Sequence, residues 1–272
     1  MDTEQNPYAP PKHSSAGYAV IENSDLRASA RRQLSGVWGK MVLAGLVYGV
    51  IASPAIYFFA RLNPFDNPAL NILFSIAYFS LLGPLYLGFS ELYLKRVRAQ
   101  DIAVNDVLSG LNRFGDGFLL TFFFILFTFL WSLLFVVPGI IKAFGYSMAY
   151  FIMYDDPTIT PLQALKKSQM MMRGYKGKLC LLFLSFIGWA SLPVLTGVIG
   201  FLFLSPSPFP YIDILGYVMS FFGWASFSVL IGVIGSLWLY PYIGVSMGNF
   251  YENLKQNQGH LLGREHNVPS SP

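Results

Sequence analysis

Charged side chains within apolar sequence are the first candidates for chemistry, because an ionised group in hydrocarbon is costly and is retained where it has a use. Two residues qualify, Lys142 and Glu91. Lys142 lies three residues into an apolar run, so its long side chain either reaches the outer headgroups or stays in the interior and binds an anionic group. Because no acidic residue is expected at this depth, a functional Lys142 would be a fixed positive charge that Arg could replace and Met could not.

The other polar stretches have ordinary structural interpretations. Glu91 is followed four residues later by Lys95, the spacing of an ion pair along one helix face at the membrane interface. The acidic pair Asp155-Asp156 precedes Pro157 and therefore predicts a turn and a helix cap. The run Met170–Met172 either forms an adaptable surface for a partner or packs against lipid and the bundle.

Metal and nucleophile chemistry have little support in the sequence. The single cysteine, Cys180, lies in an apolar run, which predicts a small buried side chain and excludes an internal disulfide. The histidines His13, His260 and His266 occupy polar segments, and no two have the spacing of metal ligands. No Ser/His/Asp set, paired carboxylates or phosphate-binding glycine loop was found. We therefore predict no cofactor, no metal site and no enzymatic activity.

The composition excludes a water-soluble fold. Of the 272 residues, 54% are hydrophobic and only 12% are charged, whereas a soluble domain has about 25% charged residues. Apolar runs of span length recur without the alternating polarity of an outer-membrane barrel. The net charge of +4 is too small to indicate a nucleic-acid surface. These features predict a helical membrane protein that does not bind nucleic acid.

The apolar runs predict an all-α, polytopic membrane bundle of six transmembrane helices. The expected spans are residues 41–60, 70–94, 117–137, 139–155, 179–204 and 214–239. They form three hairpins, the second of which turns at Val137-Pro138-Gly139. We expect a six-span membrane domain at 25–256, with disordered cytoplasmic tails at 1–24 and 257–272.

An interfacial amphipathic helix is expected before each hairpin. These helices start near Ser24-Asp25, at Asn105-Asp106 and at Thr160-Pro161, where Gln163 completes the spacing of a capping box. After the last span, Tyr240-Pro241 is expected to end the helix. The apolar stripe that follows predicts an amphipathic extension on the cytoplasmic side.

The positive charges give the orientation. Of the 18 Lys and Arg residues, 16 lie in the two tails, the approaches to the hairpins and the loops between them. Only Arg61 lies on the other side, and Lys142 lies within a span. The positive-inside rule then places both termini in the cytoplasm. The same charges can bind the anionic headgroups of membrane lipids, which are the expected partners together with a possible protein.

The last two spans contain an internal repeat. Residues 185–204 and 220–239 are identical at 14 of 20 positions, and consecutive spans run in opposite directions. The repeat therefore either packs two helices together or frames a transport site. Small or compact residues recur on one face of each copy, and we expect the two stripes to face each other or a common neighbour. The stripes are Ala190, Pro193, Gly197 and Gly200, and Ala225, Ser228, Gly232 and Gly235.

If these stripes pack against another helix, a large side chain within them should destabilise the protein. Gly197→Leu or Gly232→Leu should then lower thermostability in detergent more than Leu202→Ala or Leu237→Ala. The reverse ordering would show that the stripes face lipid.

Several motifs carry a resemblance to a known family. They are Ala164–Lys178, Leu184–Trp189, Pro138–Ala143, Tyr146-Ser147-Met148, Asp156-Pro157, Pro241-Tyr242 and Phe250–Leu254. With these, the chain resembles a bacterial membrane family known as domain of unknown function 975. It is more distantly similar to the membrane domain of glycerophosphodiester phosphodiesterases. The Pro-rich N-terminal tail and the second Gly-Trp-Ala-Ser copy depart from the pattern. The resemblance implies a bacterial inner-membrane bundle and brings no site residues with it.

Three classes of function follow. The first is a non-enzymatic bundle that binds lipid or partner proteins, which fits the sparse polar interior. The second is a small-molecule transporter, suggested by Lys142, the inverted helix pair and the prolines at positions 54, 84 and 193. The third is a membrane enzyme that acts on lipid headgroups, for which no residue set is found.

Overall fold

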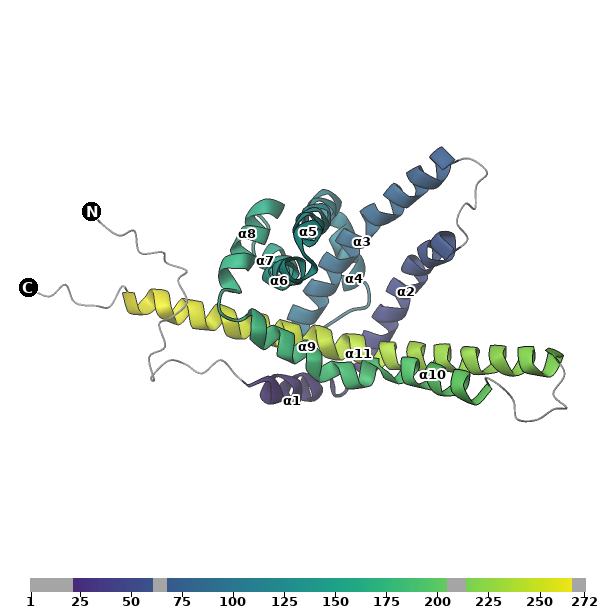
Figure 1. The fold of residues 1–272 in the computed structure, drawn as a ribbon. Coiled ribbons are helices and arrows are strands. Elements are labelled where there is room, and N and C mark those ends of the chain that lie inside the picture. Colours follow the sequence, from purple (N-terminus) through teal and green to yellow (C-terminus); the bar gives the residue numbers. More distant parts are fainter. Residues whose placement is uncertain (1–21, 61–67, 205–213, 266–272) are drawn as a thin grey trace, which may run out of the picture.

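The computed structural model describes residues 22–60, 68–204 and 214–265, and all regular secondary structure in this part of the chain is helical (Figure 1). The all-α prediction is therefore confirmed. The helices are α1 (Asn23–Leu34), α2 (Trp38–Ala60), α3 (Pro68–Val97), α4 (Asp106–Ser109), the 3-10 helix η1 (Gly110–Arg113), α5 (Phe114–Leu134), α6 (Val136–Tyr146), α7 (Ala149–Asp155), α8 (Pro161–Met171), α9 (Lys176–Ala190), α10 (Leu192–Leu204) and α11 (Ile214–Glu265).

Four helical stretches of the described chain are long and apolar enough to cross a membrane. They are Asp106–Leu134, Val136–Asp155, Lys176–Gly200 and Phe222–Asn257. A fifth is present if α1 and the first part of α2, which meet at a bend of 94°, count as one span. The side chains of residues 52–60 and 68–79 lie outside the described set. The structure therefore supports a multi-pass membrane protein with four or five candidate spans. The sixth span, at 70–94, stays a prediction.

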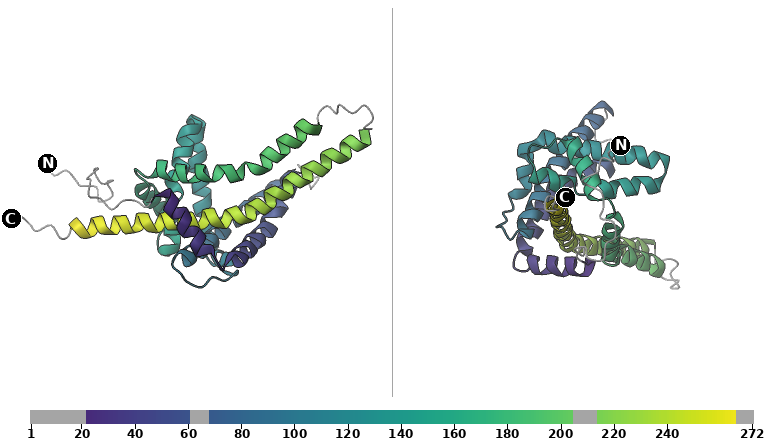
Figure 2. Two further views of the ribbon diagram at one scale, coloured as in Figure 1. Left: turned by 90° about the horizontal axis from the view of Figure 1, so that it is seen from below. Right: turned by 90° about the vertical axis from the view of Figure 1, so that its left-hand side faces the viewer.

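The helices converge on one buried core and diverge away from it. Helix α3 contacts α4, α5, α7 and α11, and α1 packs along α11. Helices α5 and α6 run at a steep angle to α10 and α11. Figure 1 shows α5 and α6 nearly end-on, and Figure 2 shows them from the side. The largest fully buried side chains include Leu26 and Leu34 of α1, Leu92 of α3, Ile152 of α7 and Phe250 of α11. The core is therefore built from segments far apart in the sequence.

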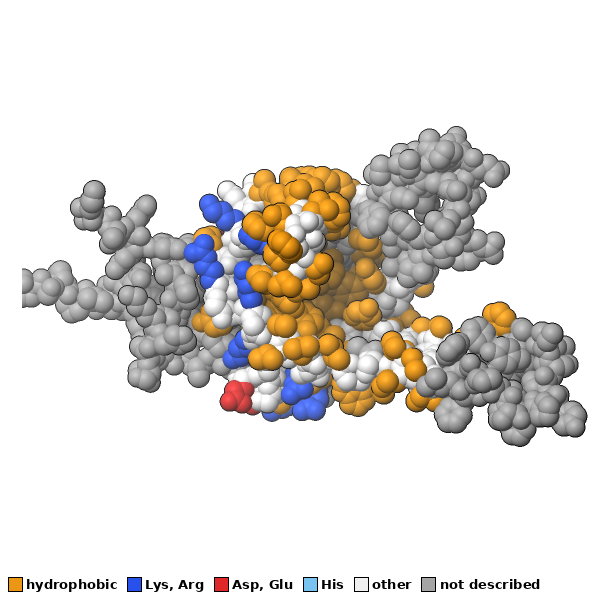
Figure 3. All heavy atoms as spheres, viewed as in Figure 1, with side chains coloured by type: hydrophobic (Ala, Val, Ile, Leu, Met, Phe, Trp, Pro, Cys, Tyr) orange, Lys and Arg blue, Asp and Glu red, His pale blue; other side chains and the backbone are white. Residues whose placement is uncertain are grey.

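Large apolar side chains are exposed along the helices that leave this core. They gather on α5 and α6, on α10, and on the part of α11 before Pro241. Figure 3 shows hydrophobic side chains covering the middle of the molecule, with Lys and Arg side chains to one side of them. A surface of this kind is stable in contact with lipid and is not stable in water.

Helix α11 corrects the expectation that Tyr240-Pro241 ends the last span. The helix runs from Ile214 through Pro241 to Glu265, 52 residues in all, a length of about 78 Å at 1.5 Å per residue. An internal proline costs about 3 kcal/mol. Here it is offset because Tyr242, Val245, Phe250 and Leu254 are buried in the core.

The same helix extends into the segment that the sequence assigned to a C-terminal tail. Residues 257–265 belong to α11, so the helix ends nine residues later than expected. At the other end of the described chain α1 begins at Asn23, close to the expected start at Ser24-Asp25. The predicted tail residues 1–21 and 266–272 lie outside the described part of the chain.

Candidate functional site

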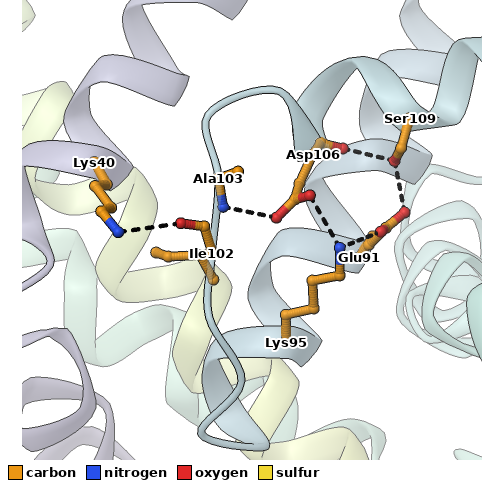
Figure 4. A network of polar contacts seen from close by, with 7 residues as sticks. All are labelled: Lys40, Glu91, Lys95, Ile102, Ala103, Asp106 and Ser109. Atoms are coloured by element: carbon orange, nitrogen blue, oxygen red, sulfur yellow. Dashed lines mark hydrogen bonds and ion pairs between the residues drawn. The ribbon is translucent and has the colours of Figure 1, made fainter.

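The first candidate site is an ion cluster at the end of α3, which we call the Lys95 cluster (Figure 4). The Lys95 ammonium lies 2.7 Å from Glu91 Oε1 and donates a hydrogen bond of 2.9 Å to Asp106 Oδ1. Ser109 Oγ donates to Glu91 Oε2 at 2.5 Å, and the backbone N–H of Ala103 donates to Asp106 Oδ2 at 2.9 Å. The expected Glu91–Lys95 ion pair is confirmed, and the cluster fastens α4 onto α3.

Lys95 is a fixed charge. Burial alone would lower the pKa of its ammonium, but the hydrogen bonds to Glu91 and Asp106 favour the charged form, and the net result is a pKa above the ordinary value. The side chain therefore stays protonated throughout the physiological range. Its part in the cluster is to hold two helices together rather than to transfer a proton.

A second cluster joins the ends of α3 and α7 to α11, and we call it the Asp155 cluster. Arg98 follows α3 and lies 2.7 Å from Asp155 Oδ1 at the end of α7 and 2.5 Å from Glu252 Oε1 of α11. Asp155 Oδ2 accepts hydrogen bonds from the Tyr251 hydroxyl at 2.8 Å and from Lys255 Nζ at 2.5 Å. Only 12% of the Asp155 side chain is exposed. One carboxylate thus binds two cations and a hydroxyl.

Sequence reasoning missed the role of Asp155 and was correct about its neighbours. Asp156 forms the expected turn, because its Oδ1 accepts from the Thr158 N–H and hydroxyl at 3.2 and 2.7 Å. The capping box of Thr160 and Gln163 at the start of α8 is also confirmed. A signal for the Asp155 cluster existed in α11, where Tyr251 and Lys255 are spaced for one helix face.

The structure changes the expected surroundings of Lys142. The Lys142 ammonium lies 4.5 Å from the centroid of the Trp131 ring, a cation–π contact between α6 and α5. The sequence placed Lys142 near the outer end of its span and Lys176 near the inner end of the next. In the structure the end of the Lys176 side chain lies against Gly145, where an added Cβ would be 3.4 Å from Lys176 Cε and 3.5 Å from Nζ. The structure therefore brings the Lys176 side chain against α6 one helical turn from Lys142, and the depth of Lys142 in the membrane stays a prediction.

A buried hydroxyl bridges the break between α6 and α7. Ser168 of α8 is fully buried, donates to the Gly145 carbonyl at 2.8 Å and accepts from the Met148 N–H at 3.1 Å. A break in an apolar helix frees backbone groups that lipid cannot satisfy, and a Ser side chain from a neighbouring helix can replace the missing bonds. Ser168 performs that role here.

The small-residue stripes lie where α10 meets α11. A Cβ added to Gly232 would lie 3.4 Å from Pro193 Cβ, and one added to Gly197 would lie 3.9 Å from Ser228 Oγ. In the repeat, Pro193 corresponds to Ser228 and Gly197 to Gly232. Exchanging the two copies therefore converts one contact into the other, as expected of two similar helices packed around a local two-fold axis.

The other stripe positions are less regular. Gly200 leaves space for the indole of Trp224, whose Nε1 donates to the Thr196 carbonyl at 2.7 Å. Ala225 is half-buried, whereas a Cβ on Gly235 would meet nothing within 4 Å. The side chain of Ala190 lies outside the described set.

The two copies also differ in helix continuity, for a local reason. The first copy breaks at Ser191, between α9 and α10, whereas the second lies within the unbroken α11. Pro193 removes a backbone donor just after the break, and Ser228 at the equivalent position keeps that donor.

Comparison with known proteins gives one family. A family model described as protein of unknown function (DUF975) matches residues 21–143 and 135–219, which together make up nearly three quarters of the chain. The match ends before Pro241-Tyr242 and Phe250–Leu254, so these parts of the resemblance lie outside it. No curated protein and no solved structure matches the chain. The similarity to the membrane domain of glycerophosphodiester phosphodiesterases therefore stays a prediction.

Proposed function

The chain belongs to the DUF975 family, and we propose that it is a non-enzymatic protein of the bacterial inner membrane that binds anionic lipids or a partner protein. The observation that carries this proposal is the division of the surface. Large apolar side chains cover the diverging helices, whereas Lys and Arg side chains gather to one side (Figure 3). A protein with this surface can sit in the bilayer and present cations to headgroups or to an acidic partner.

The use of the hydroxyl groups supports a binding role over catalysis. Hydroxyls along the apolar helices donate to backbone carbonyls three or four residues earlier in their own helix. Examples are Ser90, Thr121, Ser132, Ser185, Thr196, Ser228 and Ser246. A hydroxyl engaged in this way adds little polarity to the helix surface and is not activated as a nucleophile.

A transporter is the alternative, and the contacts between α10 and α11 favour it. Inverted copies related by a local two-fold axis frame substrate sites in some transporters. One pair of helices is a smaller unit than the duplicated bundles of those proteins. Uptake of a solute by proteoliposomes containing the purified protein would replace the lipid-binding proposal with this one.

The topology that completes the proposal has six spans with both termini in the cytoplasm, supported by the 16 positive charges assigned to one side. Reporter fusions after Gln100 and after Gln169 are expected to be active only as cytoplasmic reporters. A periplasm-dependent reporter that is active at either position would contradict this topology.

The function itself is tested by purification in mild detergent followed by analysis of what co-purifies. We expect anionic phospholipids to be enriched in the eluate over their share of the source membrane, or one protein to be recovered in fixed proportion. An eluate with the lipid composition of the membrane and no stoichiometric protein would contradict the proposal. A bundle of similar size that carries few Lys and Arg residues serves as the control.

A further inference from the structure

Three positive side chains belong to neighbouring elements beside the α5–α6 pair, and we call them the cation triad. Lys142 belongs to α6, Arg173 follows α8, and Lys176 begins α9. The end of the Lys176 side chain lies against Gly145, one helical turn beyond Lys142. Lys142 lies three residues before Gly145 in α6, and Arg173 lies three residues before Lys176. The fold therefore concentrates like charges that α6 and α9 could have kept apart.

Within the part of the chain that the structure describes, the members of the triad have no acidic partner; the partly buried Arg27 and Arg96 also lack one, but each donates to a backbone carbonyl, of Asn23 and Gln33. Lys95, Arg98, Arg113 and Lys255 each lie within 3 Å of a carboxylate. Across the described residues, no carboxylate lies within ion-pair distance of any member of the triad. Lys142 instead faces the Trp131 ring, which attracts a cation but carries no net charge. Three repelling cations are stabilised most directly by an anion bound between them.

The backbone beside the triad also favours an anion. Helix α9 has 15 residues and begins at Lys176, and its N-cap residue, Tyr175, makes no side-chain capping bond. The first N–H groups of such a helix point outward and carry partial positive charge. A Cβ on Gly177, in this first turn, would meet nothing within 4 Å, so the approach to these groups is open.

The position of the triad identifies the source of the anion. Beyond Lys142, the α5–α6 pair exposes large apolar side chains, among them Phe129, Phe135 and Ile140. Arg173 is exposed on the other side of the triad, and Lys142 and Lys176 are half-buried between the two regions. The triad thus lies at a boundary between an apolar and a polar surface, which is the level of phospholipid phosphates. A Trp beside it is also typical of this level.

From these observations we infer that Lys142, Arg173 and Lys176 bind the phosphate of an anionic phospholipid headgroup. The inference deepens the proposed lipid binding by assigning it to one site between α6, α8 and α9. The glycerol and acyl chains of the bound lipid then lie along the exposed apolar side chains of α5 and α6. Lys142 contributes charge and is held in place by Trp131.

The test is a lipid titration of the detergent-solubilised full chain, read out as the shift in its thermal unfolding midpoint. The probes are phosphatidylglycerol, phosphatidylcholine and inorganic phosphate, each alone. We expect the parent protein to be stabilised by phosphatidylglycerol and not by the other two. The triple variant Lys142→Gln, Arg173→Gln, Lys176→Gln should bind phosphatidylglycerol about a hundredfold more weakly, since each cation near an anionic headgroup contributes to affinity.

A second triple variant controls for net charge. Arg31→Gln, Lys166→Gln and Lys167→Gln remove the same charge from exposed positions outside the triad, and this variant should keep the affinity of the parent. Equal weakening in both triple variants would overturn the site. If the first triple variant does not fold, Arg173→Gln alone, at an exposed side chain, should weaken binding about fivefold. Lys142→Arg should retain binding, because the charge is kept.

The remaining outcomes separate this inference from the function on which it rests. Parental affinity in the triad variant would overturn the site and leave lipid binding at another place intact. A parent protein that responds equally to phosphatidylglycerol and phosphatidylcholine would overturn both the site and the anionic-lipid function. Stabilisation by inorganic phosphate equal to that by phosphatidylglycerol would overturn the lipid as the source of the anion.

Discussion

Asp155→Asn is expected to lower the thermal unfolding midpoint in detergent by about 6 to 12 °C. The Asp155 carboxylate binds Arg98, Lys255 and the Tyr251 hydroxyl, and its side chain is only 12% exposed. An amide of the same shape carries no charge and offers a single acceptor oxygen. Removing one partner from a buried ion pair costs about 3 kcal/mol, because the remaining charges stay desolvated without compensation.

The adjacent residue provides a matched control for this prediction. Asp156 carries the same carboxylate, but it interacts with Thr158 in an exposed turn. Asp156→Asn keeps an acceptor oxygen for that turn and should shift the midpoint by no more than about 2 °C. Equal shifts for the two variants would show that the Asp155 cluster does not hold α3, α7 and α11 together.

Features encoded by neighbouring residues were predictable from the sequence. The capping box at Thr160 and Gln163, the turn at Asp156 and the Glu91–Lys95 pair each depend on residues at most four positions apart. Such signals need no knowledge of the tertiary fold. The helical class was equally accessible, because apolar runs of this length leave few other structures in a membrane.

Features that depend on distant contacts were not predictable in the same way. Pro241 was expected to end a helix because a proline removes a backbone hydrogen bond. That local cost is outweighed by burial of Phe250 and its neighbours in a core to which α1, α3 and α9 contribute. The Asp155 cluster and the cation triad also join elements from different parts of the chain. The spacing of residues in a helix predicts which side chains share a face. It does not predict which other helix packs against that face.

A close contact between α5 and α3 shows the same limit, and it gives the second large expected effect. Gly117→Ala should lower the unfolding midpoint by about 4 to 8 °C. A Cβ at Gly117 would lie 2.7 Å from the Cα and N atoms of Pro84, so α5 and α3 must separate to admit it. Overpacking of this kind costs about 3 kcal/mol, and the better helix propensity of Ala returns only about 1 kcal/mol.

The contact is reciprocal, which makes relaxation difficult. A Cβ at Gly83 of α3 would lie 2.1 Å from the Gly117 carbonyl oxygen. Backbone atoms face each substitution, so no flexible side chain can turn aside to make room. Gly83→Ala should therefore destabilise the protein at least as much as Gly117→Ala. The sequence directed attention to the stripes of the repeat, where no added Cβ would meet backbone atoms of the neighbouring helix this closely.

Gly115 is the control for close packing, because it lies two residues from Gly117 in the same helix and has opposite surroundings. Its position is exposed, and an added Cβ would meet nothing within 4 Å. Gly115→Ala should therefore leave the midpoint unchanged or raise it by up to about 4 °C through helix propensity alone. If the unfolding midpoint falls with Gly117→Ala and rises with Gly115→Ala, the close packing of α5 on α3 is at Gly117. A decrease of the same size at both positions would instead indicate that helix α5 tolerates no change in its first turn.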